Sequence, residues 1–220
     1  AFRNYISDND VSNDGIKTPT LSLVFNGGPM VLRQLLTSLA EDRSPAIIFT
    51  ETGGAAADIA AYTLCETDKE RLDVLADLER RHKEDAHYVE AAKELLPKIS
   101  EAGSEVGPDG STPLLTIVPD INEVEELEHI LYEAILNGCR TQREMVLLAV
   151  AWGDRDVLRT LLEKEAEWQG ERLERRQAKG LAFESALLRK DVDTATCMME
   201  YAAEAGDVLL SLLFDEKFIA

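Results

Sequence analysis

Residues 21–58 constrain the fold most, because they repeat one plan twice. A short apolar run at 21–25 ends at two glycines and leads into a helical pattern, and a second run at 46–50 does the same. Repeated units of apolar strand, glycine turn and helix predict parallel strands buried on both faces of a sheet. The two glycine pairs then meet at the carboxyl edge of that sheet, where open α/β folds bind ligands.

The remaining pattern divides the chain into three parts. Residues 1–20 read as a helix tail and polar linker, 21–120 as the sheet domain with a third strand at 114–118, and 121–220 as helices. Within the helices, 148–162 and 185–199 echo each other at an offset of about 35 residues, as ankyrin-like repeats do. The expected fold is α/β, a doubly wound parallel sheet followed by an all-α repeat region. We also expect that the chain begins inside a fold and lacks earlier strands.

Residues 66–104 show an amphipathic helical pattern with charged residues on the opposite faces. The apolar spacing widens once, where His82 takes the expected apolar position. We expect the helix to break near His82 to His87, and again at Pro97.

Bulk composition limits the class of partner. The formal net charge is −19, which opposes long-range attraction to nucleic acid or to an anionic membrane surface. No apolar run approaches the roughly 18 residues of a membrane span, and no signal peptide is visible. Three scattered cysteines suggest reduced thiols in the cytosol. A small phosphorylated ligand remains possible, because local backbone groups can bind it.

The first glycine pair lies in Asn26-Gly27-Gly28-Pro29. Glycines let backbone approach a phosphate or ribose, Pro29 suits the first helical position, and the N–H groups of the following helix would face an anion. The alternative is a plain tight turn. The motif matches neither the Walker loop nor Gly-x-Gly-x-x-Gly.

The second pair lies in Glu51-Thr52-Gly53-Gly54, followed by Asp58. Glu51 and Asp58 could accept hydrogen bonds from a sugar. The alternative for Asp58 is an acid favourably placed near a helix N-terminus. We therefore predict a ligand site made of these residues: Asn26, Gly27, Gly28, Pro29, Glu51, Thr52, Gly53, Gly54 and Asp58.

Metal and nucleophile signals are weak. His82 and His87 are spaced so that a helix would separate them. His129 and Glu133 share a helical face, but two ligands do not make a zinc site. No Gly-x-Ser-x-Gly motif occurs. We predict no metal, no cofactor and no catalytic residue.

Two stretches resemble the cytosolic N-terminal region of melastatin-type transient receptor potential (TRPM) channels. Leu-Val-Phe-Asn-Gly-Gly-Pro at 23–29 and Ile-Ile-Phe-Thr-Glu-Thr-Gly-Gly-Ala-Ala-Ala-Asp at 47–58 resemble its Glu-Gly-Gly-Pro and Gly-Ser-Gly-Arg-x-Ala-Asp segments. Residues 148–157 resemble its Ala-Trp stretch. The resemblance implies a partial SLOG (LSDAT) domain with a Rossmann-like sheet, then ankyrin-like helices. It also implies a cleft that in some members binds ADP-ribose-like nucleotides and biases gating.

Three departures from the family and its relatives are informative. The family's arginine falls on Ala55, and its glutamate before Gly-Gly-Pro is Asn26. In related nucleotide phosphoribohydrolases, Gly-Gly-x-Gly-Thr-x-x-Glu ends in a glutamate that here is Gln34. Because glutamine does not exchange protons at useful pH, we do not expect an enzyme.

Three functions follow from this resemblance and its departures. The first is a non-catalytic ligand-sensing domain on the cytosolic side of a TRPM-like cation channel, with an ADP-ribose-like nucleotide as ligand. The second is an assembly module with a vestigial cleft, binding other subunits of a homo-oligomer that would be a tetramer in a channel. The third is a nucleotide N-glycosidase. Neither nucleic acid nor direct membrane contact is expected.

Overall fold

A computed structural model describes residues 20–106, 113–120, 127–139, 141–164 and 172–201. The expected helix tail and linker at 1–20 therefore lie outside the described residues, apart from Thr20. The chain divides into two compact units between Gly138 and Cys139. Sequence reasoning had placed this boundary at residue 120.

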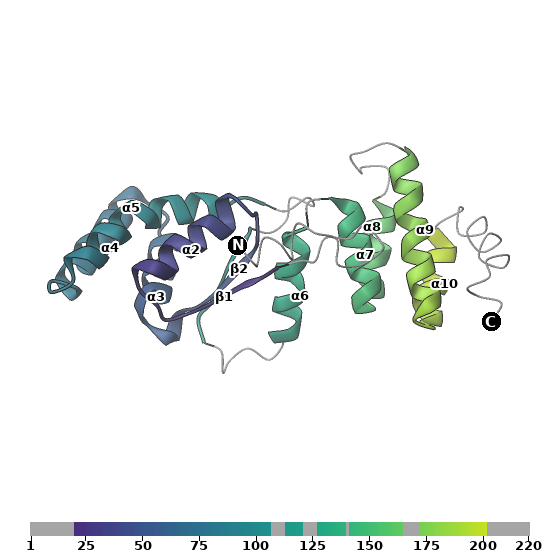
Figure 1. Ribbon diagram of the computed structural model, residues 1–220, viewed down its shortest axis with the longest axis horizontal. Coiled ribbons are helices and arrows are strands. Elements are labelled where there is room, and N and C mark those ends of the chain that lie inside the picture. Colours follow the sequence, from purple (N-terminus) through teal and green to yellow (C-terminus); the bar gives the residue numbers. More distant parts are fainter. Residues whose placement is uncertain (1–19, 107–112, 121–126, 140, 165–171, 202–220) are drawn as a thin grey trace. The chain divides into compact units, whose positions relative to one another are not determined.

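The first unit contains a parallel three-stranded sheet in the order β1-β2-β3 (Figure 1). The strands are β1 (Ser22–Phe25), β2 (Ala46–Phe49) and β3 (Leu115–Val118). Val24 pairs with Ile48, and Ile48 with Ile117, so the three strands end at one edge. The Rossmann-like sheet predicted from the two apolar runs is confirmed.

Helices cover the two faces of this sheet unequally. The larger core joins Val24, Ala46 and Ile48 to helices α2 (Pro29–Ala40), α3 (Gly54–Thr63), α4 (Asp68–Arg81) and α5 (Ala86–Gly103). On the other face, Ile47 and Phe49 pack on α6 (Leu127–Asn137). Figure 1 shows α6 beside the sheet. Because α6 packs on the sheet, it belongs to the first unit, and the division falls after it.

The position of each strand in the sheet decides how far its side chains are buried. Every side chain of the central strand β2 is buried. In β1 only Val24 is buried, whereas Leu23 and Phe25 are each 48% exposed on the face that bears α6. A short 3-10 helix, η1 (Thr50–Thr52), links β2 to α3.

The charged segment at 66–104 forms the hairpin of α4 and α5. Thr67 and Glu70 cap the start of α4 reciprocally. Helix α4 ends at Arg81 with His82 as its C-cap, where the interrupted apolar spacing predicts a break. The predicted break at Pro97 is wrong, because α5 continues through this residue to Gly103. Proline inside a helix costs about 3 kcal/mol. Here Leu96 and Ile99, buried on either side of Pro97, hold the helix against the core.

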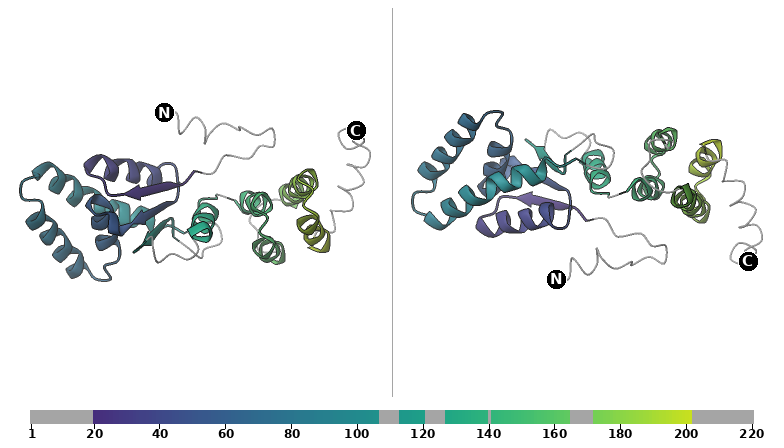
Figure 2. Two further views of the ribbon diagram at one scale, coloured as in Figure 1. Left: turned by 90° about the horizontal axis from the view of Figure 1, so that it is seen from below. Right: turned by 90° about the horizontal axis from the view of Figure 1, so that it is seen from above.

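Two helix pairs lie in the part of the second unit that the structure describes. They are α7 (Gln142–Trp152) with α8 (Arg155–Glu163), and α9 (Arg172–Leu188) with α10 (Val192–Tyr201). Seen nearly end-on, α7 lies beside α9, and α8 packs on α10 (Figure 2). The two turns correspond, with Gly153 and Lys190 both at positive φ.

Two side chains join these pairs. The Arg189 guanidinium donates to the carbonyls of Val150, at 3.1 Å, and Ala151 at the end of α7. Arg155 forms an ion pair with Asp193 at 3.3 Å. The pairs thus stack as repeats do, and their ankyrin-like character stays a prediction.

Candidate functional site

The predicted site residues lie at the carboxyl ends of β1 and β2, apart from Asp58. We call residues 26–29 and 51–54 the glycine edge. Residues 26–29 connect β1 to α2, and residues 51–54 connect β2 to α3 through η1. As expected for parallel neighbouring strands, the structure brings the two glycine pairs together.

The two turns of the glycine edge are hydrogen-bonded to each other. The Ala55 N–H donates to the Gly27 carbonyl and the Ala56 N–H to the Asn26 carbonyl, each at 3.1 Å. In return, the Asn26 N–H donates to Thr52 Oγ1 at 2.6 Å. The first turn therefore caps the start of α3, and two N–H groups of that helix are occupied by protein carbonyls.

One glycine of each pair is required by this packing. A Cβ on Gly54 would collide with the Asn26 side chain and lie 2.7 Å from the Gly27 carbonyl oxygen. A Cβ on Gly27 would lie 2.6 Å from Cγ2 of Val31. Both glycines also have positive φ, as does Asn26 at 52°. A positive φ is readily adopted by glycine, and asparagine adopts it more often than most other residues.

The other glycine of each pair faces open space. A Cβ on Gly28 or Gly53 would meet no heavy atom within 4 Å. Nearby, the N–H groups of Gly28, Met30 and Gly54 have no hydrogen-bond partner among the described residues. Pro29 occupies the first position of α2, as predicted. The open part of the edge therefore offers backbone donors and space beside them.

Charge at the glycine edge comes from one acid. Glu51 is the only ionisable side chain among residues 26–29 and 51–54. Ala55, where the family pattern has arginine, is fully buried in the core. Within these eight residues, anion binding would therefore depend on backbone N–H groups.

Asp58 is directed away from the glycine edge. Its side chain is 1% exposed and accepts hydrogen bonds from Arg81 Nη2 at 2.8 Å and from the Tyr88 hydroxyl at 2.5 Å. His82 Nε2 lies 3.7 Å from the same carboxylate, and its ring packs on Tyr88 with centroids 4.6 Å apart. Both carboxylate oxygens are thus engaged by the α4–α5 hairpin, which differs from the expected sugar contact.

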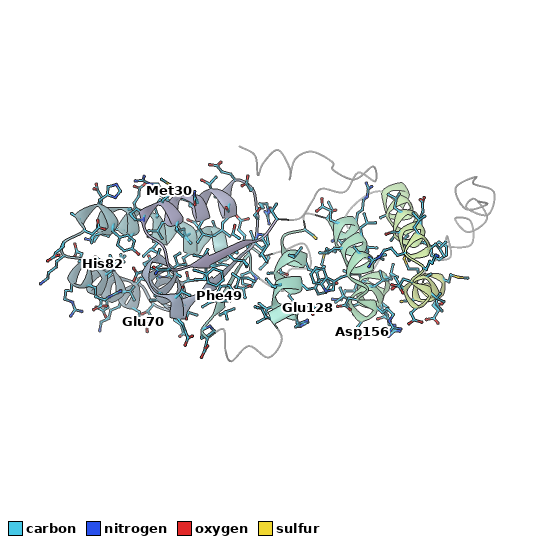
Figure 3. All side chains as sticks on the ribbon, turned by 60° about the horizontal axis from the view of Figure 1, so that its bottom comes forward. Met30, Phe49, Glu70, His82, Glu128 and Asp156 are labelled. Atoms are coloured by element: carbon cyan, nitrogen blue, oxygen red, sulfur yellow. The ribbon has the colours of Figure 1, made fainter. Side chains whose placement is uncertain are left out.

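We call Asp58, Arg81 and Tyr88 the Asp58 clasp. Burial, followed by the hydrogen bond to Asp58, raises the pKa of the Tyr88 hydroxyl well above its usual value. The hydrogen bond to Asp58 also raises the pKa of Arg81. Figure 3 shows His82 at the free end of the hairpin, well separated from Phe49 at the end of β2. The interrupted apolar spacing at His82 predicted the turn of the hairpin next to Arg81, and no sequence signal predicted the contacts with Asp58.

The histidines do not assemble a metal centre among the described residues. No group of three or more His, Cys, Asp or Glu side chains converges there. His129 Nε2 instead lies 3.2 Å from Glu133 Oε1, on an exposed face of α6.

Comparison with known families identifies the first part of the chain. Residues 1–91 match the family model described as the SLOG domain in TRPM proteins. The N-terminal part of the chain is a TRPM-type SLOG domain. The matched residues include the whole glycine edge and the Asp58 clasp, and they end within α5. No curated protein matches the chain.

The SLOG match ends at residue 91 and so includes none of the helices described after Gly138. Among the helices that the structure describes, none combines the length and apolarity needed to cross a bilayer.

Proposed function

We propose that this chain is a non-catalytic regulatory part of a TRPM-like cation channel, on its cytosolic side, and that its glycine edge binds an ADP-ribose-like nucleotide. The observation that carries the proposal is the group of N–H donors at Gly28, Met30 and Gly54, beside open space at Gly28 and Gly53. Phosphate oxygens are the acceptors that suit such a backbone site.

Affinity at this edge should be modest. The N–H groups of Ala55 and Ala56 already donate to carbonyls of the neighbouring turn, and the formal net charge of −19 opposes an anionic ligand. Charge-assisted hydrogen bonds are roughly twice as strong as neutral ones, so the missing arginine matters. This balance suits a sensor that responds to high local ligand concentration.

Thermal unfolding of the full chain with ADP-ribose tests this proposal. Ligand at about 100 times its dissociation constant should stabilise the folded chain by about 2.7 kcal/mol. Gly28→Leu should abolish this shift, because its side chain would extend into the open space where φ is −140° and any residue fits. Thr37→Leu, on the exposed surface of α2, is the matched control. An unchanged melting temperature at millimolar ADP-ribose would contradict ligand sensing.

Absence of catalysis is part of the same proposal. Gln34, at the position of the hydrolase glutamate, is an exposed amide on α2, and the Asp58 carboxylate is held inside the clasp. Neither group is placed to exchange a proton with a ligand at the edge. Release of free base from a nucleoside monophosphate by the full chain would instead support the N-glycosidase alternative.

A second function, assembly with other subunits of a homo-oligomer, is favoured by a different observation. Leu23 and Phe25 on β1 are each 48% exposed and Met30 is 61% exposed, all next to the glycine edge. Sedimentation of the full chain would test it. Leu23→Ser with Phe25→Ser should dissociate the oligomer, whereas Gly28→Leu should leave it intact. A wild-type chain that sediments as a monomer at high concentration would contradict assembly through this chain alone.

A further inference from the structure

We propose that Asp58 is a positioning residue of the glycine edge, which it couples to the α4–α5 hairpin. Asp58 lies on α3, the helix whose first N–H groups bind the Asn26–Gly27 turn. Its carboxylate binds Arg81 at the end of α4 and Tyr88 at the start of α5. One short helix therefore carries the glycine edge at one end and the clasp one turn later. The proposal concerns the geometry of the edge and requires no ligand, so it can fail independently of the proposed function.

Helix α3 has little else to fix its position. Five of its ten residues are alanine, and Ile59 and Tyr62 are its only large buried apolar side chains. Apolar stabilisation scales with buried area, and alanine buries little. The two hydrogen bonds to the Asp58 carboxylate consequently have a large share in holding α3, and with it Ala55 and Ala56, against the first turn.

Of the two hairpin helices that contact Asp58, α5 is packed more firmly in the core than α4. Tyr88 is buried on α5, which packs along α2 and α3 in the core. Helix α4 is more peripheral, since Leu78 is its only fully buried residue. Arg81 links this helix to Asp58 and also pairs with the exposed Asp77 of its own helix at 2.8 Å. Displacement of α4 would thus move the partner of Asp58, and displacement of α3 would move the partner of Arg81.

Residue-resolved amide hydrogen exchange of the full chain tests the coupling. In Asp58→Asn, the amides of Ala55 and Ala56 should exchange at least tenfold faster relative to those of Ile47 and Ile48 in β2. Tyr88→Phe keeps the Arg81 contact and should give a smaller change in the same direction. Asp77→Asn is the matched control, because it removes the exposed partner of Arg81 and leaves the clasp in place.

The outcomes separate positioning from plain stabilisation. If Asp58→Asn accelerates exchange only in residues 68–103, the clasp holds the hairpin alone and the proposal is wrong. Uniform acceleration across the first unit would also overturn it, because that is what a general loss of stability produces. If Asp58→Asn does not fold, Tyr88→Phe decides: unchanged relative exchange at Ala55 and Ala56 would refute the coupling.

Discussion

Replacing Gly54 with alanine should separate the two turns of the glycine edge. Gly54 has φ of +57°, and a Cβ there would lie 2.7 Å from the Gly27 carbonyl oxygen. The backbone must move, because the atom in the way is a carbonyl that accepts a hydrogen bond from Ala55. The left-handed conformation costs an L residue about 1–2 kcal/mol. Loss of the two bonds donated by Ala55 and Ala56 adds about 1 kcal/mol each, for a total of about 3–4 kcal/mol.

Two neighbouring glycines serve as matched controls for this substitution. Gly53→Ala creates backbone strain at φ of +76° but meets no atom within 4 Å, so it should cost about 1–3 kcal/mol. Gly28→Ala has neither strain nor contact and should stay within about 0.5 kcal/mol of the parent chain. The informative quantity is the excess of Gly54 over Gly53, about 1.5 kcal/mol from the midpoints of the two ranges, because only Gly54→Ala also breaks the two hydrogen bonds.

The two units permit an internal control in the assay. During denaturant unfolding of the full chain, the hydrogen exchange of the β2 amides would report unfolding of the first unit. Fluorescence of Trp152 and Trp168 reports the second, because both tryptophans follow Gly138. Gly54→Ala should shift the first transition and leave the fluorescence transition unchanged. Equal destabilisation by Gly53→Ala and Gly54→Ala would refute the reasoning that the turns support each other.

Three further predictions concern other contacts. Arg189→Met should destabilise the second unit by about 1–2 kcal/mol, because it removes the donor that joins the two helix pairs; a fluorescence transition equal to that of the parent chain would contradict this. The raised pKa of the Tyr88 hydroxyl means that the folded state favours the neutral phenol, so the stability of the folded chain should fall as pH rises above about 10. Tyr88→Phe should make this fall less steep, and equal pH dependence of stability in both chains would contradict the prediction. Burial raises the pKa of the Cys139 thiol to about 12, so a thiol reagent at pH 8 should modify partly exposed Cys65 first and Cys139 only after unfolding; native labelling of Cys139 would count against its burial.

The sheet was predictable because its signals are local and repeated. Each apolar run is bounded by glycine or proline, and parallel strands buried on both faces need such runs. The break near His82 was equally visible, as an interruption of helical spacing. Pro97 could not be judged in this way, because packing of Leu96 and Ile99 overrides the local cost of proline. The position of α6 was also missed, since its apolar stripe fits a helical repeat as well as a sheet face.

The adjacency of the two glycine turns could be predicted from the sequence, but the hydrogen bonds between them could not. Sequence reasoning placed the glycine turns at one edge, which follows from topology alone. It could not show that carbonyls of Asn26 and Gly27 would occupy the first N–H groups of α3, because that depends on the register between β1 and β2. Nor could it direct Asp58 towards Arg81 and Tyr88, which lie on two later helices.

The strongest test of ligand binding therefore rests on Gly28. Gly27 and Gly54 are explained by packing, and Gly53 by its positive φ, so none of these three glycines implies a ligand. Gly28 has φ of −140° and open space around its Cα, and the fold gives no reason to exclude a side chain there. We expect Gly28→Leu to retain the stability of the parent chain and lose ADP-ribose binding in calorimetry. Binding that survives this substitution would place the ligand elsewhere, and the edge would then be a structural joint between β1 and α3.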